Sequence, residues 1–278
     1  LDLDMAALLR RAVRSDIDTA CRFVSSAGIR LGEFELPITL NAPETDFQAA
    51  LKQLDLVAQL AKSLNAGCGR ITIAPSSEGV TYQENFELHR TRIAAIADLF
   101  GGHGVPIGLA LAASPALREA AEQPFIHTSE DLVTLVRTVG HPQVGIALDT
   151  WQWFVGGGTL ESLQTFPAAN IVAVRCADIA ADVDLSTIAA GQRILPDTSG
   201  LIDCHAIVQH LLQNDFQGPL TLAPSPTTFG GQSRELAVKQ ARTVLEALIN
   251  PIAPVNDAEE SSADDSIEEV VATDVVRE

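Results

Sequence analysis

The feature that most constrains the fold is a sustained alternation of strand-like and helix-like segments between Leu31 and Ile249. Short apolar runs of strand length, such as 106–112, alternate with longer stretches such as 46–65, in which apolar residues recur about every 3.6 positions. This alternation predicts parallel strands joined by right-handed helical crossovers. We expect six strands in the region and a further strand at Leu1.

The expected elements are spaced as in an α/β barrel. Strands are expected at 29–38, 70–75, 106–112, 144–149, 171–178 and 219–224, and helices at 5–27, 46–65, 84–100, 129–139, 159–163, 201–214 and 234–249. Whether the first helical stretch is broken near Ser15–Asp16 is left open. A closed barrel of eight βα units takes about 250 residues, so we predict a (β/α)8 TIM barrel over residues 1–250. Whether the first βα unit is present is left open. A doubly wound open sheet is the alternative, but its GxGxxG fingerprint does not follow the first strand.

Residues 251–278 have a different composition. They hold nine acidic residues and one arginine and no aromatic residue. Such a segment buries too little apolar surface to offset chain entropy, so we predict a disordered acidic tail. Its short apolar steps leave open a partner-binding motif.

Charge and cysteine content restrict the partners. The net charge of -18 argues against nucleic acid and anionic membranes, both of which require basic surface. Four widely separated cysteines without CxxC spacing argue against a zinc site or a disulfide framework, so we expect reduced thiols and a cytoplasmic location. The oligomeric state is left open.

The stretch 144–158, VGIALDTWQWFVGGG, is the reference point for a site. A buried strand ends on Asp149, which in a barrel lies at the carboxyl end of the strand, where ligands bind. The alternative is that Asp149 caps the following turn.

Several motifs together resemble the xylose isomerase-like TIM barrels. They lie at residues 82–89, 107–109, 148–153, 174–178, 193–196 and 218–221. The resemblance implies a TIM barrel that isomerises or epimerises a sugar or sugar phosphate. It also implies a divalent cation, Mn or Mg, held by Glu, Asp, His and Glu from four strands, with the two glutamates moving the substrate proton.

Most of the implied metal ligands are absent from this sequence. The first Glu falls on Ala110, the Asp on Asp149, the ligand His on Arg175 and the last Glu on Ala223, while a further family His falls on Gln152. Alanine neither binds a metal nor accepts a proton, and a guanidinium repels a cation. We therefore predict no metal and no other cofactor, with Mn or Mg expected only if this positional match is wrong, and we predict an Asp149–Arg175 ion pair in place of the metal.

The candidate site residues follow from these positions. The catalytic candidates are Asp149, Arg175 and Glu35, with Glu33 on the same strand as an alternative base and outward-facing glutamates as the simpler reading. The substrate-binding candidates are Trp151, Gln152, Trp153, Asp178 and Arg193. Aromatic faces suit sugar rings, although packing explains the tryptophans equally well, and Asp178 also suits a role in fixing its loop.

Three functions are consistent with the sequence. The residues favour a barrel that has lost most of its metal site and binds a small sugar, sugar phosphate or other anionic metabolite at its mouth. The alternatives are an active isomerase or epimerase with a rearranged site, and a non-catalytic interaction scaffold.

Overall fold

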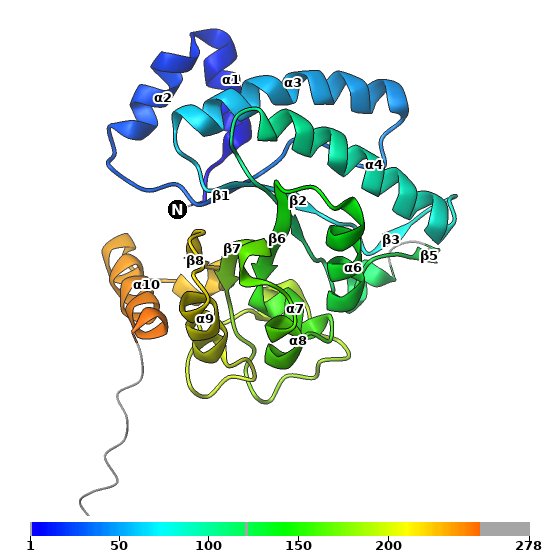
Figure 1. Cartoon of the computed structure of the whole chain (residues 1–278). Helices are drawn as coiled ribbons and strands as arrows, with labels where there is room; N and C mark the ends of the chain where they lie inside the picture. The colour runs from blue at the N-terminus through cyan, green and yellow to red at the C-terminus, as the bar shows by residue number, and fades with distance from the viewer. Residues whose placement is uncertain (1, 120–121, 251–278) are drawn as a thin grey trace, which may run out of the picture.

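The computed structural model describes residues 2–119 and 122–250. A six-stranded sheet lies at its centre, with the strand order β1-β2-β4-β6-β7-β8 and every neighbouring pair parallel (Figure 1). Its strands are β1 (Glu33–Glu35), β2 (Cys68–Thr72), β4 (Ile107–Ala110), β6 (Val144–Asp149), β7 (Ile171–Cys176) and β8 (Leu220–Leu222). A separate antiparallel pair is formed by β3 (Ser76–Ser77) and β5 (Gln123–Pro124). The parallel order confirms the α/β fold class.

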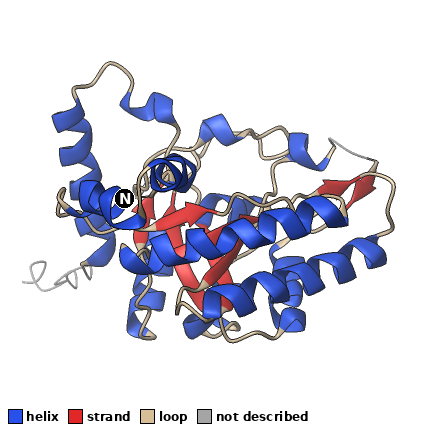
Figure 2. Cartoon of the chain, turned by 90° about the horizontal axis from the view of Figure 1, so that it is seen from above, coloured by secondary structure: helices blue, strands red, loops and turns tan. Residues whose placement is uncertain are grey.

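The helices surround this curled sheet (Figure 2). They are α1 (Met5–Arg14), α2 (Ile17–Ser25), α3 (Glu44–Ser63), α4 (Tyr82–Gly101), α5 (Pro115–Arg118), α6 (Ser129–Val139), α7 (Thr150–Val155), α8 (Leu160–Gln164), α9 (Cys204–Gln213) and α10 (Arg234–Ile249). Neighbouring helices pack on one another, α3 on α4, α4 on α6 and α9 on α10. This is the arrangement of a TIM barrel.

The two outer strands of the order, β1 and β8, approach each other through a glycine. A Cβ atom at Gly67, just before β2, would lie 2.7 Å from Pro219 Cγ and 2.9 Å from the carbonyl oxygen of Gly32. Any larger residue would push these segments apart. The sheet therefore curves round until the approaches to β1 and β8 nearly meet, as in a half-closed barrel.

Small side chains form one buried cluster in the barrel interior. Its members are Cys68, Ala110, Ala147 and Ala173, from four strands. Gly108 faces the same interior, since a Cβ there would lie 2.7 Å from the Ala147 Cβ.

Most expected elements are confirmed, and the exceptions have physical causes. The helices α6 and α10 and the strand β6 have the expected bounds. The helical stretch at 5–27 forms two helices, and the break lies at Ser15–Asp16, where the sequence left one open, because Asp16 begins α2 as its N-cap. The strand expected at 29–38 is limited to β1. Helix α7 was not expected, because its TWQWFV sequence carries no recognisable period. In the segment between β7 and α9, Ile194 forms an isolated antiparallel bridge with Asp178.

Two expectations concern the ends of the chain. Leu3 N donates to the carbonyl oxygen of Glu33 at 3.0 Å, so the start of the chain lies beside β1. The predicted acidic tail, 251–278, lies outside the described residues. Among the helices that are described, none has the length and apolar character needed to cross a membrane.

Candidate functional site at the barrel mouth

Asp149, the last residue of β6, is held on two sides. Its Oδ1 accepts from the backbone N–H of Gln152 at 3.0 Å, which makes it the N-cap of α7. Both of its carboxylate oxygens also accept from Nη1 of Arg193, at 3.0 and 2.8 Å. The Asp149 side chain is 2% exposed. Its two roles in the structure are therefore to cap a helix and to neutralise the partly buried guanidinium of Arg193.

Arg193 is fixed by its surroundings as well as by this ion pair. Its guanidinium carbon lies 4.7 Å from the ring centre of Trp151, a cation–π arrangement. Its carbonyl oxygen accepts from the backbone N–H of Ser225 at 3.0 Å. The loop that carries Arg193 is thus tied to the segment after β8, and the guanidinium covers the Trp151 ring.

The predicted Asp149–Arg175 ion pair is wrong in its cation. The two residues are register partners on β6 and β7, but the Arg175 guanidinium is directed to other carboxylates. Its Nη1 lies 3.4 Å from Glu33 Oε1 and its Nη2 lies 3.5 Å from Asp2 Oδ2. The sequence pattern placed Arg175 beside Asp149 correctly. It could not show that Arg193 pairs with Asp149 instead, because Arg193 lies on a loop whose path the pattern does not predict.

Glu33 is the buried carboxylate of the mouth. Its Oε1 accepts from Arg70 Nη1 at 3.0 Å and also faces Arg175, while its Oε2 has no hydrogen-bond partner among the described residues. The residue is 3% exposed. Burial raises the pKa of Glu33, and the neighbouring charges of Arg70 and Arg175 only partly oppose that rise.

Glu35, the glutamate named as a catalytic candidate, lies at the rim. Its side chain is 57% exposed, with Oε2 3.8 Å from Arg70 Nε, and Oε1 accepts from the backbone N–H of Thr72 at 3.3 Å. Of the two glutamates of β1, Glu33 is therefore the one inside the charged cluster. The alternation of the strand predicted that they share a face but not which one is deeper.

The remaining candidates hold the local structure together. Gln152 Oε1 accepts from the backbone N–H of Ala113 at 2.6 Å, and Trp153 Nε1 donates to the carbonyl oxygen of Thr159 at 3.2 Å. Asp178 Oδ1 accepts from the backbone N–H groups of Ile179 and Ile202, at 2.7 and 2.8 Å. Trp151 and Trp153 are 0% and 3% exposed. These contacts fix the loops around the mouth.

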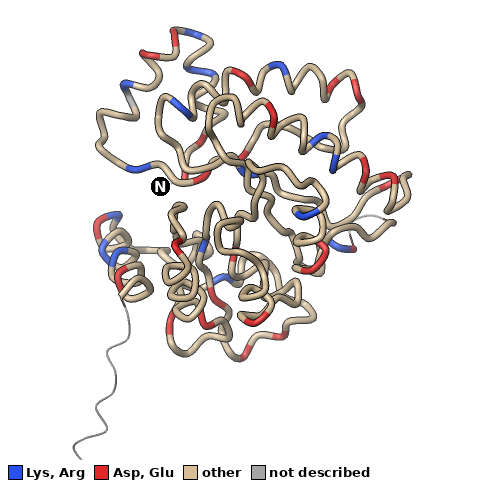
Figure 3. Tube along the Cα trace, in the orientation of Figure 1, with Lys and Arg blue, Asp and Glu red and all other residues tan. Residues whose placement is uncertain are grey.

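Arg70 and Asp2 belong to the cluster and were missed from the sequence. The signal for Arg70 is a single charged residue within an otherwise uncharged strand, CGRIT. Asp2 carried no such signal, because its reach to Arg175 depends on the path of the chain beside β1. Arg70, Arg175 and Arg193 pair with Glu33, Asp2 and Asp149, and Glu35 lies beside Arg70 at the rim. Figure 3 shows basic and acidic residues interspersed along the chain.

The residues at the implied metal positions do not fit a divalent cation. Ala110 and Ala223 are buried and carry no ligand atom, Arg175 is cationic, and both oxygens of Asp149 are engaged by Arg193. Across residues 2–119 and 122–250, no group of three or more His, Cys, Asp or Glu side chains is arranged to hold a metal ion.

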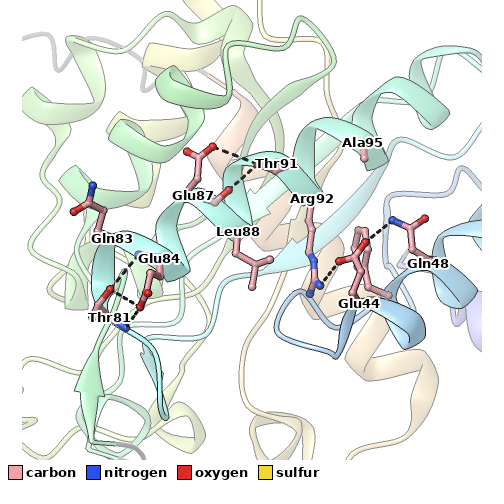
Figure 4. Close-up of a pocket in the computed structure, with 11 residues that line it drawn as sticks. Glu44, Gln48, Thr81, Gln83, Glu84, Glu87, Leu88, Thr91, Arg92 and Ala95 are labelled. Atoms are coloured by element: carbon pink, nitrogen blue, oxygen red, sulfur yellow. Dashed lines mark hydrogen bonds and ion pairs between the residues drawn. The ribbon is translucent and has the colours of Figure 1, made fainter.

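A separate groove of about 710 Å³ lies between α3 and α4 on the outer helical layer (Figure 4). Its polar side chains bond to one another: Arg92 Nη2 pairs with Glu44 at 2.7 Å, and Thr81 and Glu84 form a capping box. Arg92 also donates to the carbonyl oxygen of Ala42 at 2.7 Å. These contacts tie α4 to α3, so the groove is explained by helix packing, away from the strand ends.

The sequence profile of the xylose isomerase-like TIM barrel family matches residues 4–248. The chain belongs to this family. No curated protein shows a significant match to it. The family assignment agrees with the parallel sheet, with the helical layer and with the placement of the charged cluster at the barrel mouth.

Solved structures share the fold at low sequence identity. A xylose isomerase domain protein from Alicyclobacillus acidocaldarius subsp. acidocaldarius is 24% identical with a TM-score of 0.79, over 89% of this chain and 87% of that one. The IOLI protein, solved with a zinc atom, is 17% identical with a TM-score of 0.71, over 86% and 84%. The 3-keto-D-glucoside 4-epimerase YcjR of E. coli is 12% identical with a TM-score of 0.63, over 89% and 87%. These similarities establish the fold alone.

Proposed function

We propose that this protein binds a small sugar, sugar phosphate or other anionic metabolite at the barrel mouth, and that it does so without a divalent metal. The observation that carries the proposal is the engagement of Asp149. Both of its oxygens accept from Arg193, so the cation beside this carboxylate is a side chain of the protein itself. A guanidinium binds oxyanions and hydroxyl groups but leaves no coordination position for metal chemistry.

The polar lining of the mouth supports a small, oxygen-rich ligand. Arginine, glutamate and threonine side chains from separate strands converge there, and such convergence above a barrel is the usual place for metabolite recognition. The fold neighbour named as a 3-keto-D-glucoside epimerase supports a ligand of carbohydrate type.

The first experiment separates metal-dependent from metal-independent binding. Calorimetry with MnCl2 and MgCl2 on the purified protein should show no stoichiometric binding, with Asp149→Ala as the paired control. Tight binding that is lost in Asp149→Ala would overturn the proposal, because it would show that the carboxylate leaves Arg193 for a metal.

The second experiment identifies the ligand class. The protein, held in a chelator, is screened by thermal shift and ligand-observed NMR against sugars, sugar phosphates and small carboxylates. We expect at least one class to bind, and Arg193→Gln to weaken that binding. Arg242→Gln is the matched control, because Arg242 is an exposed residue on α10. Equal binding by both variants would place the ligand elsewhere.

A second candidate function is proton transfer by a rearranged site, and Glu33 favours it. A buried carboxyl group with a raised pKa and one free oxygen suits a general base or acid. A ligand found in the screen is incubated in deuterated water and its C–H signals are followed by NMR. Exchange by the natural protein that is lost in Glu33→Gln would establish this activity, and ligand binding without exchange would limit the function to binding.

A further inference from the structure

The barrel mouth contains more hydrogen-bond donors than its carboxylates use. Glu33 Oε1 faces Nη1 of both Arg70 and Arg175, so one carboxylate oxygen serves two guanidinium groups. Among the described residues, the buried Nε atoms of both arginines and the Thr221 Oγ1 have no hydrogen-bond partner, although Arg70 Nε lies 3.8 Å from Glu35 Oε2. Thr221 is the register partner of Arg175 on β8, so unused donors from β2, β7 and β8 surround the same interior.

The second carboxylate on Arg175 is weakly placed. Asp2 Oδ2 lies 3.5 Å from Nη2, and its side chain is 35% exposed. Half-exposed pairs at this distance contribute little to stability, because water competes for both partners. The Arg175 side chain is itself 27% exposed, so a dissolved anion can reach it. The Asp2 carboxylate thus occupies a position that another oxyanion can take over.

We propose that Arg175, assisted by Arg70 and Thr221, binds the carboxylate or phosphate group of a small metabolite in competition with Asp2, and that Glu33 takes up a proton when the anion binds. The proposal rests on the proposed function and specifies it. It commits the ligand to an oxyanion. It also makes Glu33, whose Oε2 has no hydrogen-bond partner among the described residues, a positioning residue that donates a hydrogen bond to the anion once it is protonated.

The charges around Glu33 determine the direction of the pH dependence. Arg70 from β2 and Arg175 from β7 favour its ionised form, whereas burial, Asp2 and Asp149 from β6 disfavour it, so the pKa of Glu33 is raised. The neighbouring Cys68 thiol has its own pKa raised by burial and remains neutral. An anion bound beside Glu33 disfavours the ionised form further. Binding is therefore tighter at low pH and weakens as pH rises through the pKa of Glu33 in the free protein.

The test uses sulfate and glycolate, neither of which changes charge between pH 5.5 and 8, and follows binding by calorimetry. Above the pKa of Glu33, the dissociation constant should rise about tenfold per pH unit if one proton is taken up. Binding of glycolate alone assigns the site to carboxylates, and binding of sulfate alone assigns it to phosphate-like groups. The absence of binding by both anions at pH 5.5 would overturn the proposal.

Variants separate the roles of the side chains. Glu33→Gln should retain binding and remove its pH dependence, Asp2→Asn should tighten binding several-fold, and Arg175→Gln should abolish it. Arg242→Gln should leave both affinity and pH dependence unchanged. Circular dichroism checks the fold of each variant. Asp2 is partly exposed, so Asp2→Asn should fold even if Arg175→Gln does not. An affinity for both anions that is unchanged in Asp2→Asn would refute the proposed competition between the anion and the Asp2 carboxylate.

The outcomes distinguish this inference from the proposed function. Binding of a neutral sugar, with no binding of sulfate or glycolate, refutes the anion site and leaves the proposed function standing. Tight metal binding through Asp149 refutes the proposed function, whereas the anion titrations still decide the role of Arg175. A pH dependence that persists in Glu33→Gln refutes the assignment of the proton to Glu33.

Discussion

The pairing of Asp149 with Arg193 can be tested by a double-mutant cycle. Asp149→Asn keeps an oxygen that can accept from the Gln152 N–H, so the cap of α7 is retained while the negative charge is removed. Arg193→Met removes the guanidinium but keeps a side chain able to cover the Trp151 ring. Each single variant leaves one charge at the mouth without its partner, and the double variant removes both charges.

The magnitude follows from burial. With Asp149 2% exposed, Arg193→Met strands a carboxylate, which typically costs 3–5 kcal/mol in a fully buried pair. The Arg193 side chain is 13% exposed, so water relieves part of this cost and we expect about 2–3 kcal/mol. Asp149→Asn strands the better solvated partner and should cost about 1–2 kcal/mol. The double variant should cost about 2 kcal/mol, leaving a coupling of about 1–3 kcal/mol.

The assay is urea unfolding followed by circular dichroism for the natural protein and the three variants. The exposed pair Arg242–Glu246 on α10 provides the control cycle, and its coupling should be several-fold smaller because solvent screens it. A parallel cycle pairs Asp149→Asn with Arg175→Met. A coupling to Arg193 no larger than the usual error of about 0.5 kcal/mol, or an equal coupling to Arg175, would refute the assigned partner.

Three further outcomes follow from buried groups elsewhere. Burial lowers the pKa of His89 to about 4 from 6.5, so its folded form resists protonation; stability present above pH 6.5 should fall by up to about 3 kcal/mol as pH drops towards 4. His89→Phe should flatten this fall in urea titrations, and an unchanged slope would contradict it. A Cβ at Gly108 would lie 2.7 Å from the Ala147 Cβ, so Gly108→Ala should lower the free energy of unfolding in urea by about 1–3 kcal/mol. Gly191→Ala is the control and should be close to neutral, because no atom lies within 4 Å of its Cβ position. Equal costs for the two variants would refute the packing argument. Arg92→Met removes the hydrogen bonds from α4 to the carbonyl oxygens of Leu40 and Ala42 in the loop before α3, which should cost about 3 kcal/mol and lower the thermal midpoint; an unchanged midpoint would show that the link is dispensable.

The fold was predictable because its signals are local. The helix at 129–139 and the strand at 144–149 each have a recognisable pattern and a residue that ends them. The helix ends at Gly140, with φ +62°, and the apolar strand ends at the charged residue Asp149. Helix α7 was missed because its two tryptophans and its phenylalanine give no amphipathic pattern; it begins because Asp149 caps it. The sequence could not predict how short β1 is, because its bounds are set by its pairing with β2.

The site was only partly predictable, because ion pairs depend on the relative positions of distant segments. Asp149 and Arg193 are 44 residues apart in the chain and meet only after the loop from Asp178 to Ile202 is folded. The strand pattern could place Asp149 and Arg175 side by side, and it did so correctly. It could not show that a loop arginine reaches Asp149 first, leaving Arg175 to face Glu33.

Asp149 illustrates why a retained ligand residue is weak evidence for a retained metal. In this barrel the carboxylate caps α7 through Gln152 and neutralises Arg193, which in turn covers Trp151. Each contact needs an acidic or similarly accepting side chain at the end of β6, whether or not a cation binds. The side chains of Ala110 and Ala223 are buried and carry no polar atom, so they make no comparable contact. An accepting side chain at this position therefore has structural roles in the described part of the chain that are independent of a bound cation.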